Sequence, residues 1–238
     1  MNTPRKIAVI GNSHAACYKA ALDETPALAG DVSYTFFAAI AGLMAAFRAT
    51  GGRMVATGDK LPAQIARSSG GDSNMDPADY DGFLLVGMSF RMHPFFDARL
   101  SGAVRDLALR DRLCGDYGWQ LAQDLRSLTD KPIHVAHMPL PAFDDAVFAQ
   151  GAPGQPLSYA DHAALWRPLL SELDLTLLEQ PEDTRHRDLM TRRSFARASI
   201  RMADGAAHGD DERFHMNPAF GARMLRALQE NTAQLAAG

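Results

Sequence analysis

Short hydrophobic runs alternate along the chain with longer segments whose hydrophobic residues recur every three or four positions. The runs are rich in Val, Ile, Leu and Phe and are bounded by Gly, Pro or Asp, which is typical of buried strands. They cover residues 6–11, 33–39, 82–87, 132–138 and 175–179. Strands that alternate with helices favour a parallel sheet with helices on both faces. The pattern therefore predicts an α/β fold with five parallel strands.

Capping residues mark two of the predicted helices. Ser158, with Asp161 three residues later, opens one of them. Asn217 is a good N-cap, and Pro218 suits the first turn of a last helix that we expect to run to about Leu235.

Two segments carry little hydrophobic pattern. Residues 51–79 are rich in Gly, Ser, Asp and Pro, and we expect a loop or lid insertion there. Residues 142–156 are similar but shorter. Neither segment has the character of a linker and no internal repeat is present, so we expect a single domain over residues 1–238.

Composition narrows the possible partners and the compartment. With 47% hydrophobic and 22% charged residues the chain is typical of a globular protein, and its net charge of −4 disfavours nucleic-acid binding. The longest apolar run, residues 36–47, is too short to span a bilayer, and the N-terminus lacks a signal-peptide core. Cys17 and Cys114 form no metal or disulfide motif, so we expect a reduced, cytoplasmic protein. The oligomeric state is left open.

Ser13 follows the first predicted strand directly, in the sequence Gly11–Asn12–Ser13–His14. Ligands of open parallel sheets bind beyond the carboxyl ends of the strands, and backbone N–H groups at a helix start can hold a developing oxyanion. This position favours a nucleophilic serine. A serine here is also a common helix N-cap, and the tetrapeptide alone favours the cap.

Carboxylates and a histidine precede the last predicted helix, in the segment Asp210–Asp211–Glu212–Arg213–Phe214–His215. A neutral imidazole, with a pKa of about 6.5, can take a proton from serine at neutral pH. A neighbouring carboxylate can orient the ring and stabilise the imidazolium. Taken alone, the segment is equally typical of a solvated acidic loop.

Together the two ends of the chain resemble the SGNH/GDSL hydrolase family. In that family the nucleophilic serine follows the first strand in a Gly-Asp-Ser block, and the acid and base lie in an Asp-x-x-His block near the C-terminus. Residues 7–13 are similar to the first block, and residues 212–217, followed by Phe220–Gly221, are similar to the last. The resemblance spans nearly the whole chain. It implies a flavodoxin-like, three-layer α/β/α sandwich and a serine esterase that forms an acyl-enzyme.

The resemblance assigns roles to residues at the two ends. Ser13 would be the nucleophile and His215 the base, with either Glu212 or Asp211 as the acid. The sequence departs from the family pattern at two positions, because Asn12 replaces the usual aspartate and His14 follows the serine.

The sequence also departs from the family pattern at the residues expected to form the oxyanion hole. The family donates a side-chain N–H from an asparagine in a Gly-x-Asn block, but here the block reads Gly87–Met88–Ser89, so Ser89 would donate a hydroxyl instead. Ser13 would supply its backbone N–H. The glycine that the family has after its second strand corresponds best to Gly42, with Gly51 or Gly52 as alternatives. Arg91, which follows the third predicted strand, is a further candidate to line the opening of the site.

We therefore expect hydrolysis of a small carboxylic ester, such as a short acyl ester or an O-acetylated sugar, without cofactor or metal. Two alternatives stay open: a catalytically weak relative that binds a ligand, and an acyltransferase that uses the same acyl-enzyme.

Other motifs give weaker indications. Ala15 breaks the Gly-x-Ser-x-Gly elbow of α/β-hydrolases, and no phosphate-loop motif is present. His134 and His137 would point to opposite faces of a strand, which argues against a shared metal. A basic stripe of arginines, at 193, 197 and 201, is expected if that segment is helical.

Overall fold

The computed structural model describes residues 3–88, 90–92, 101–143, 157–202 and 205–237, with the side chains of residue 41 and residues 233–237 left out. Five parallel strands form its main sheet in the order β2-β1-β6-β7-β8. The strands are β1 (Arg5–Gly11), β2 (Val32–Ala38), β6 (Gly82–Val86), β7 (Ile133–Ala136) and β8 (Leu175–Leu178). Counted within this sheet, the order is the flavodoxin-like 2-1-3-4-5. The predicted fold class is therefore confirmed.

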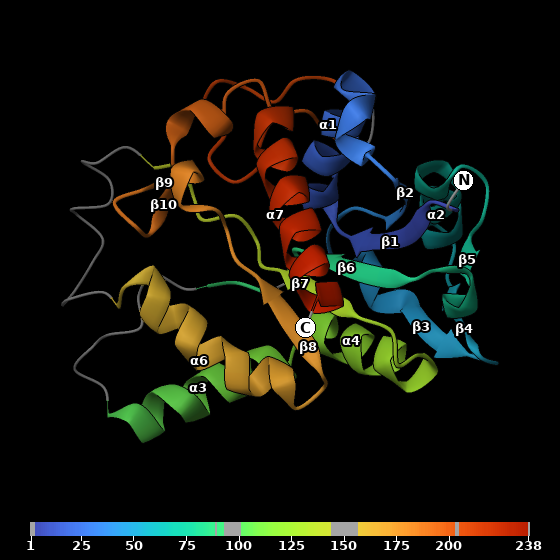
Figure 1. The fold of residues 1–238 in the computed structure, drawn as a ribbon, viewed down its shortest axis with the longest axis horizontal. Helices are drawn as coiled ribbons and strands as arrows, with labels where there is room; N and C mark the ends of the chain where they lie inside the picture. Colours follow the sequence, from blue (N-terminus) through green and yellow to red (C-terminus); the bar gives the residue numbers. More distant parts are fainter. Residues whose placement is uncertain (1–2, 89, 93–100, 144–156, 203–204, 238) are drawn as a thin grey trace.

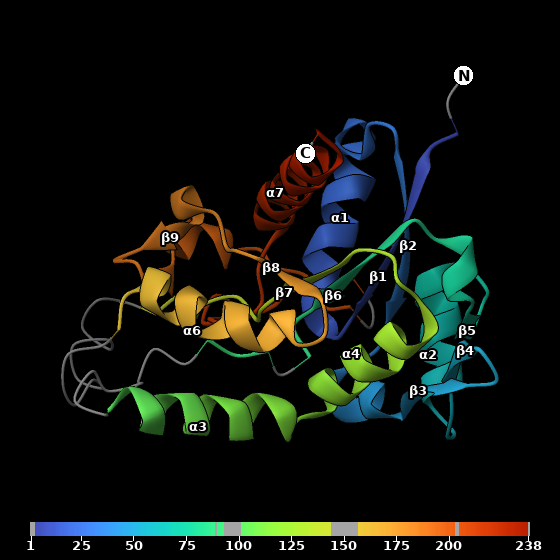
Figure 2. The ribbon, with the colours of Figure 1, turned by 60° about the horizontal axis from the view of Figure 1, so that its bottom comes forward.

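Helices cover both faces of the sheet (Figures 1 and 2). One face is covered by α1 (Ala16–Glu24) and α7 (Pro218–Ala237). The other is covered by α2 (Leu61–Ser69), α3 (Gly102–Cys114), α4 (Tyr117–Leu128) and α6 (Tyr159–Ser171). In β1, Val9 packs toward α1 and α7, whereas Ala8 and Ile10 pack toward the opposite layer. This alternation explains why the strand is apolar throughout, because both of its faces are buried.

The segment 51–79 is not the loop that its composition predicts. It contains β4 (Arg53–Ala56), α2 and β5 (Asn74–Met75), and β4 pairs antiparallel with both β3 (Phe47–Thr50) and β5. Met54, Ile65 and Met75 are buried in the core layer that also holds α4. Its few apolar residues are spaced among Gly, Ser and Asp, which hides short elements from a periodicity argument.

The arginines at 193, 197 and 201 do not form a helical stripe. Only a short 3-10 turn, Arg193–Phe195, is present in this segment, and the chain from 197 to 201 is irregular. Upstream, β9 (Arg185–His186) and β10 (Met190–Thr191) form a small hairpin. The recurrence of arginine at every fourth position therefore does not reflect a helix in this segment.

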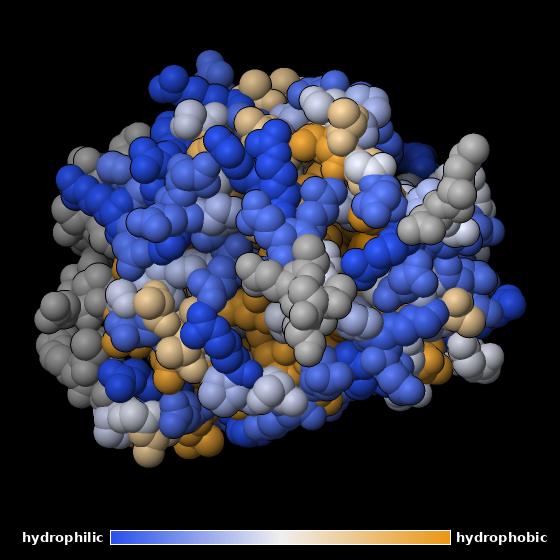
Figure 3. Space-filling model, in the orientation of Figure 1, coloured by the Kyte–Doolittle hydropathy of each residue, from blue (hydrophilic) through white to orange (hydrophobic). Residues whose placement is uncertain are grey.

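The surface view in Figure 3 shows mostly hydrophilic side chains on this face, with smaller hydrophobic areas between them. Large hydrophobic residues that are exposed include Ile40, Val104, Leu107 and Phe214. Within the described residues, no helix combines the length and the apolar character needed to cross a membrane.

Candidate active site

Ser13 follows the carboxyl end of β1, the strand that lies between β2 and β6 in the sheet. From β1 the chain continues to β2 on one side and later to β6 on the other, so the strand order changes direction here. Ligand sites of doubly wound sheets are found at this switch point. The Asn12 side chain accepts a hydrogen bond from the backbone N–H of His14 at 3.1 Å and so caps the 3-10 turn Ser13–Ala15. Asn12, and not Ser13, is therefore the cap, which leaves the Ser13 hydroxyl for another partner.

That partner is His215, from the opposite end of the chain. The Oγ atom of Ser13 lies 3.0 Å from Nε2 of His215. The other ring nitrogen, Nδ1, lies 3.1 Å from Oε2 of Glu212. A hydroxyl, an imidazole and a carboxylate thus form a continuous chain of hydrogen bonds, the arrangement by which an imidazole can remove a proton from serine.

Glu212 is held by the backbone of its own loop. Its Oε1 atom accepts hydrogen bonds from the N–H groups of Arg213, Phe214 and His215 at 2.9, 2.6 and 3.0 Å. Burial by itself raises the pKa of Glu212, but the N–H groups of Phe214 and His215, together with the His215 ring, lower it to about 2. The carboxylate is consequently ionised at neutral pH, as a partner of an imidazolium must be.

Asp211 occupies a different environment. It is exposed, and within the described residues no hydrogen bond joins it to His215. Of the two acids that the sequence leaves open, Glu212 is the one that contacts the ring.

Arg193 fixes the loop that carries these groups. Its guanidinium donates hydrogen bonds to the carbonyl oxygens of Asp210 and Glu212. A second tie runs from the backbone N–H of Ala142 to the carbonyl oxygen of Arg213, at 2.8 Å. Arg193 thus positions residues 210–215, which we call the acid loop. Sequence analysis missed this role because it considered the arginine only as part of a helical stripe.

The last helix brings His215 to Ser13 by packing on α1. Asn217 caps α7, because its Oδ1 accepts the N–H of Phe220 at 3.2 Å, and its Nδ2 donates to the carbonyl oxygens of Ser194 and Arg197 at 2.9 Å each. At the crossing of α7 with α1, a Cβ added to Gly221 would lie only 2.1 Å from the carbonyl oxygen of Cys17. Only glycine permits this approach.

Replacing Gly221 with alanine should therefore move α7 away from α1. We expect a loss of about 1–3 kcal/mol in the free energy of unfolding, as for other overpacked sites. If the proposed function is right, kcat should fall as well, by about 10² for a displacement of the base of ~1 Å. Urea denaturation and ester hydrolysis measure the two effects.

The control for this substitution is Gly102→Ala at the start of α3, where an added Cβ meets no atom within 4 Å. That variant should be as stable as the wild type or slightly more stable, because alanine restricts the unfolded chain. Equal stability of the two variants would contradict the packing account of Gly221.

Two more imidazole rings stack on His215, and sequence analysis gave neither of them a role. His14 lies 5.0 Å away between ring centroids with an interplanar angle of 20°, and His208 lies 4.4 Å away at 11°. Burial, followed by the charges of His215 and Arg91, lowers the pKa of His14 to about 3. His14 is therefore neutral at physiological pH and does not repel an imidazolium at His215. No sequence motif marks His208, which precedes His215 by seven positions.

The predicted oxyanion residues are described only in part. Ser89 lies outside the described residues. Gly42 is exposed in the turn that follows β2, whose end is joined to the end of β1 by a hydrogen bond from Ala39 N–H to the Gly11 carbonyl oxygen at 3.2 Å. Arg91 is exposed, and its Nε donates to Sδ of Met138 at 3.4 Å. It is close enough for its charge to affect His14.

Gly87 is required where β6 ends beside this site. Its φ of +71° lies in the left-handed region, and an added Cβ would lie 2.5 Å from Oδ1 of Asn12. Any side chain here would displace the cap that precedes Ser13.

His134 and His137 lie apart from this constellation. Both are buried, and burial lowers the pKa of each to about 4. His137 is fixed by hydrogen bonds to the Met138 carbonyl oxygen at 2.6 Å and to the Tyr159 hydroxyl at 2.8 Å. It serves to anchor the chain beyond β7.

The comparisons with known proteins gave matches only among solved structures. No family model matches the sequence, and no curated protein matches it significantly. Three structures of low sequence identity align over most of the chain. A candidate SGNH hydrolase from Slackia heliotrinireducens is 14% identical with a TM-score of 0.47, over 96% of this chain and 98% of the other. A carbohydrate acetylesterase family member from Sinorhizobium meliloti is 13% identical with a TM-score of 0.43, over 98% and 100%.

The third structure is the periplasmic domain of a lipopolysaccharide acetyltransferase from Salmonella ser. Paratyphi A. It is 11% identical with a TM-score of 0.42, over 98% of this chain and 85% of the other.

Proposed function

We propose that the protein is a serine esterase that cleaves a small carboxylic ester through an acyl-enzyme. The observation that carries the proposal is the hydrogen-bonded chain from Ser13 Oγ through the His215 ring to Glu212, with distances of 3.0 and 3.1 Å. These are hydrogen-bonding distances for a nucleophile, its base and the acid that orients the base.

In the first half of the reaction, Ser13 Oγ attacks the ester carbonyl while Nε2 of His215 takes its proton. Nδ1–H of His215 donates to Glu212, whose charge stabilises the imidazolium. The tetrahedral oxyanion accepts hydrogen bonds from the backbone N–H of Ser13 and from the groups proposed at Gly42 and Ser89. The imidazolium then gives its proton to the departing alcohol, which leaves an acyl group on Ser13.

In the second half, His215 takes a proton from a water molecule, whose oxygen attacks the acyl carbonyl. The bond from the acyl carbon to Ser13 Oγ then breaks, His215 returns the proton to Oγ, and the acid is released. Phe214 lies where it can contact a small apolar acyl or alcohol group of the substrate, because its side chain is 51% exposed and it directly precedes His215. Its ring meets that of Phe143 edge to face at 5.8 Å.

A fluorophosphonate probe tests the proposal, because only a serine that its base activates should react with it. We expect one label per chain, located at Ser13 by peptide mass spectrometry, and no label after prior denaturation. Absence of label on native protein would favour a ligand-binding protein that performs no turnover. Product analysis with and without an added alcohol then separates hydrolysis from acyl transfer.

A further inference from the structure

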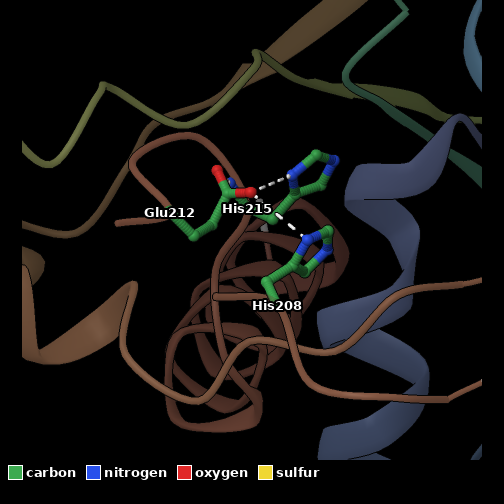
Figure 4. Close-up of side chains that lie close together, drawn as sticks. All are labelled: His208, Glu212 and His215. Carbon is green, nitrogen blue, oxygen red and sulfur yellow. Dashed lines mark hydrogen bonds and ion pairs between the residues drawn. The ribbon is translucent and has the colours of Figure 1, made fainter. Parts of the chain in front are cut away.

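A second histidine contacts the proposed acid. His208 Nδ1 lies 3.3 Å from Oε2 of Glu212, the same oxygen that Nδ1 of His215 approaches at 3.1 Å. Figure 4 shows both rings turned toward this one oxygen. His208 is held by its backbone N–H, which donates to the Ser199 carbonyl oxygen at 2.8 Å. The proposed hydrolysis requires His215 and Glu212 but leaves His208 without a function.

The three residues converge as ligands of a metal ion do. One ligand atom from each lies within 4.8 Å of the others. A tetrahedral zinc ion with ligand bonds of about 2.0–2.2 Å holds its ligand atoms about 3.3–3.6 Å apart. The two distances from Glu212 to the histidines, 3.1 and 3.3 Å, are close to that separation.

The donor types select among cations. Two imidazoles and one carboxylate make a His₂Glu set, which zinc accepts in proteins with a water molecule as the fourth ligand. Magnesium and calcium prefer oxygen ligands throughout, so two nitrogen donors disfavour them. Side-chain exposures of 18% for His208, 16% for Glu212 and 26% for His215 leave the cluster partly screened but accessible to an ion.

We propose that His208, Glu212 and His215 bind one Zn²⁺ through Nδ1, Oε2 and Nδ1, respectively. The ion accepts a lone pair from each of the three atoms, and a water molecule completes the tetrahedron. The two stacked rings must turn about their Cβ–Cγ bonds so that their planes splay toward the ion. The acid loop already holds Glu212 in place, so the adjustment is confined to the histidines.

Zinc at this position stops the proposed reaction. A neutral His215 whose Nδ1 binds the metal carries its single proton on Nε2, the atom that faces Ser13 Oγ at 3.0 Å. Nε2 then has no lone pair to take the serine proton, and Glu212 no longer orients the ring. The cluster is thus a site for reversible inhibition by zinc. The inhibition rests on the proposed function, whereas the binding does not.

Equilibrium dialysis with ZnCl₂ tests the binding without using activity. The protein is the Ser13→Ala variant, which keeps all three ligands. We expect one Zn²⁺ per chain and no comparable binding of Mg²⁺. Adding His208→Phe, which keeps a flat ring against His215 but removes the nitrogen, should weaken zinc binding by ~10-fold or more. His186→Ala, at an exposed histidine of β9, is the matched control and should bind as before.

Unchanged zinc affinity in the His208→Phe background overturns the site. For the inhibition, each protein with an intact Ser13 is compared with its own metal-free rate. The wild type should lose activity with zinc and recover it with EDTA, whereas His208→Phe should be much less sensitive. Zinc binding at the cluster without loss of rate overturns the inhibition alone. If no ester hydrolysis is measurable in metal-free protein, the proposed function fails, and dialysis still decides the zinc site.

Discussion

Replacing Ser13 with alanine should lower kcat for a short-chain nitrophenyl ester by about 10⁶, close to what removal of a serine nucleophile costs other hydrolases. In the proposed mechanism, alanine removes the oxygen that forms the acyl-enzyme and leaves His215 without a proton to take. KM for the ester should change little, because the hydroxyl contributes little to binding before attack. Initial rates measured by nitrophenol release give both constants.

The fold should survive this change, because Ser13 is not the cap of its turn; Asn12 is. Matching circular dichroism spectra and urea midpoints would show that only chemistry is lost. Turnover equal to that of the wild type would remove Ser13 from the mechanism and with it the proposed function.

Replacing Glu212 with glutamine should lower kcat by about 10⁴, the cost of losing the carboxylate that holds the base in its correct tautomer. The amide is nearly the same size, but it is neutral and offers the ring either a carbonyl oxygen or an NH₂ group. It therefore does not stabilise an imidazolium. The pair Glu212→Gln and Asp211→Asn separates the two acids, because both changes remove one negative charge from the same loop.

Asp211→Asn should retain the wild-type rate within a factor of about two, because an exposed acid interacts weakly with its surroundings. The comparison is made by kcat/KM at one ionic strength, so that loss of charge alone is accounted for. A large loss in Asp211→Asn with normal rates in Glu212→Gln would assign the acid to Asp211 and contradict the geometry.

The sheet could be predicted from the sequence because its strands are buried on both faces. Val9 and Ala8 pack into opposite layers, so the run reads as continuously apolar and is bounded by Gly11. The antiparallel strands β3, β4 and β5 could not be predicted in the same way. Their segment combines buried residues such as Met54 and Met75 with exposed neighbours and with the Gly51–Gly52 turn, and its strands are only two to four residues long.

The candidate site likewise contains residues that the sequence could indicate and residues that it could not. Ser13 and His215 could be singled out as candidates because each lies beside an element boundary that the sequence marks, and the structure brings the two side chains within 3.0 Å. The choice between Asp211 and Glu212 could not be made, because it depends on which carboxylate turns inward. That choice is made by three successive backbone N–H groups, and no residue type reports their direction. His208 and Arg193 reach the candidate site only because of the path that their loops take in the fold, so no spacing in the sequence indicates them.

The packing of α7 on α1 also bears on when the protein can first react. A ribosome makes Ser13 before the acid loop and α7, which follow it by more than 190 residues. A nascent chain that has folded its first strands holds a serine with no base beside it. Synthesis must proceed beyond α7 before the hydroxyl acquires its partner. On the proposed function, a protease that trims α7 would return the protein to that unreactive condition.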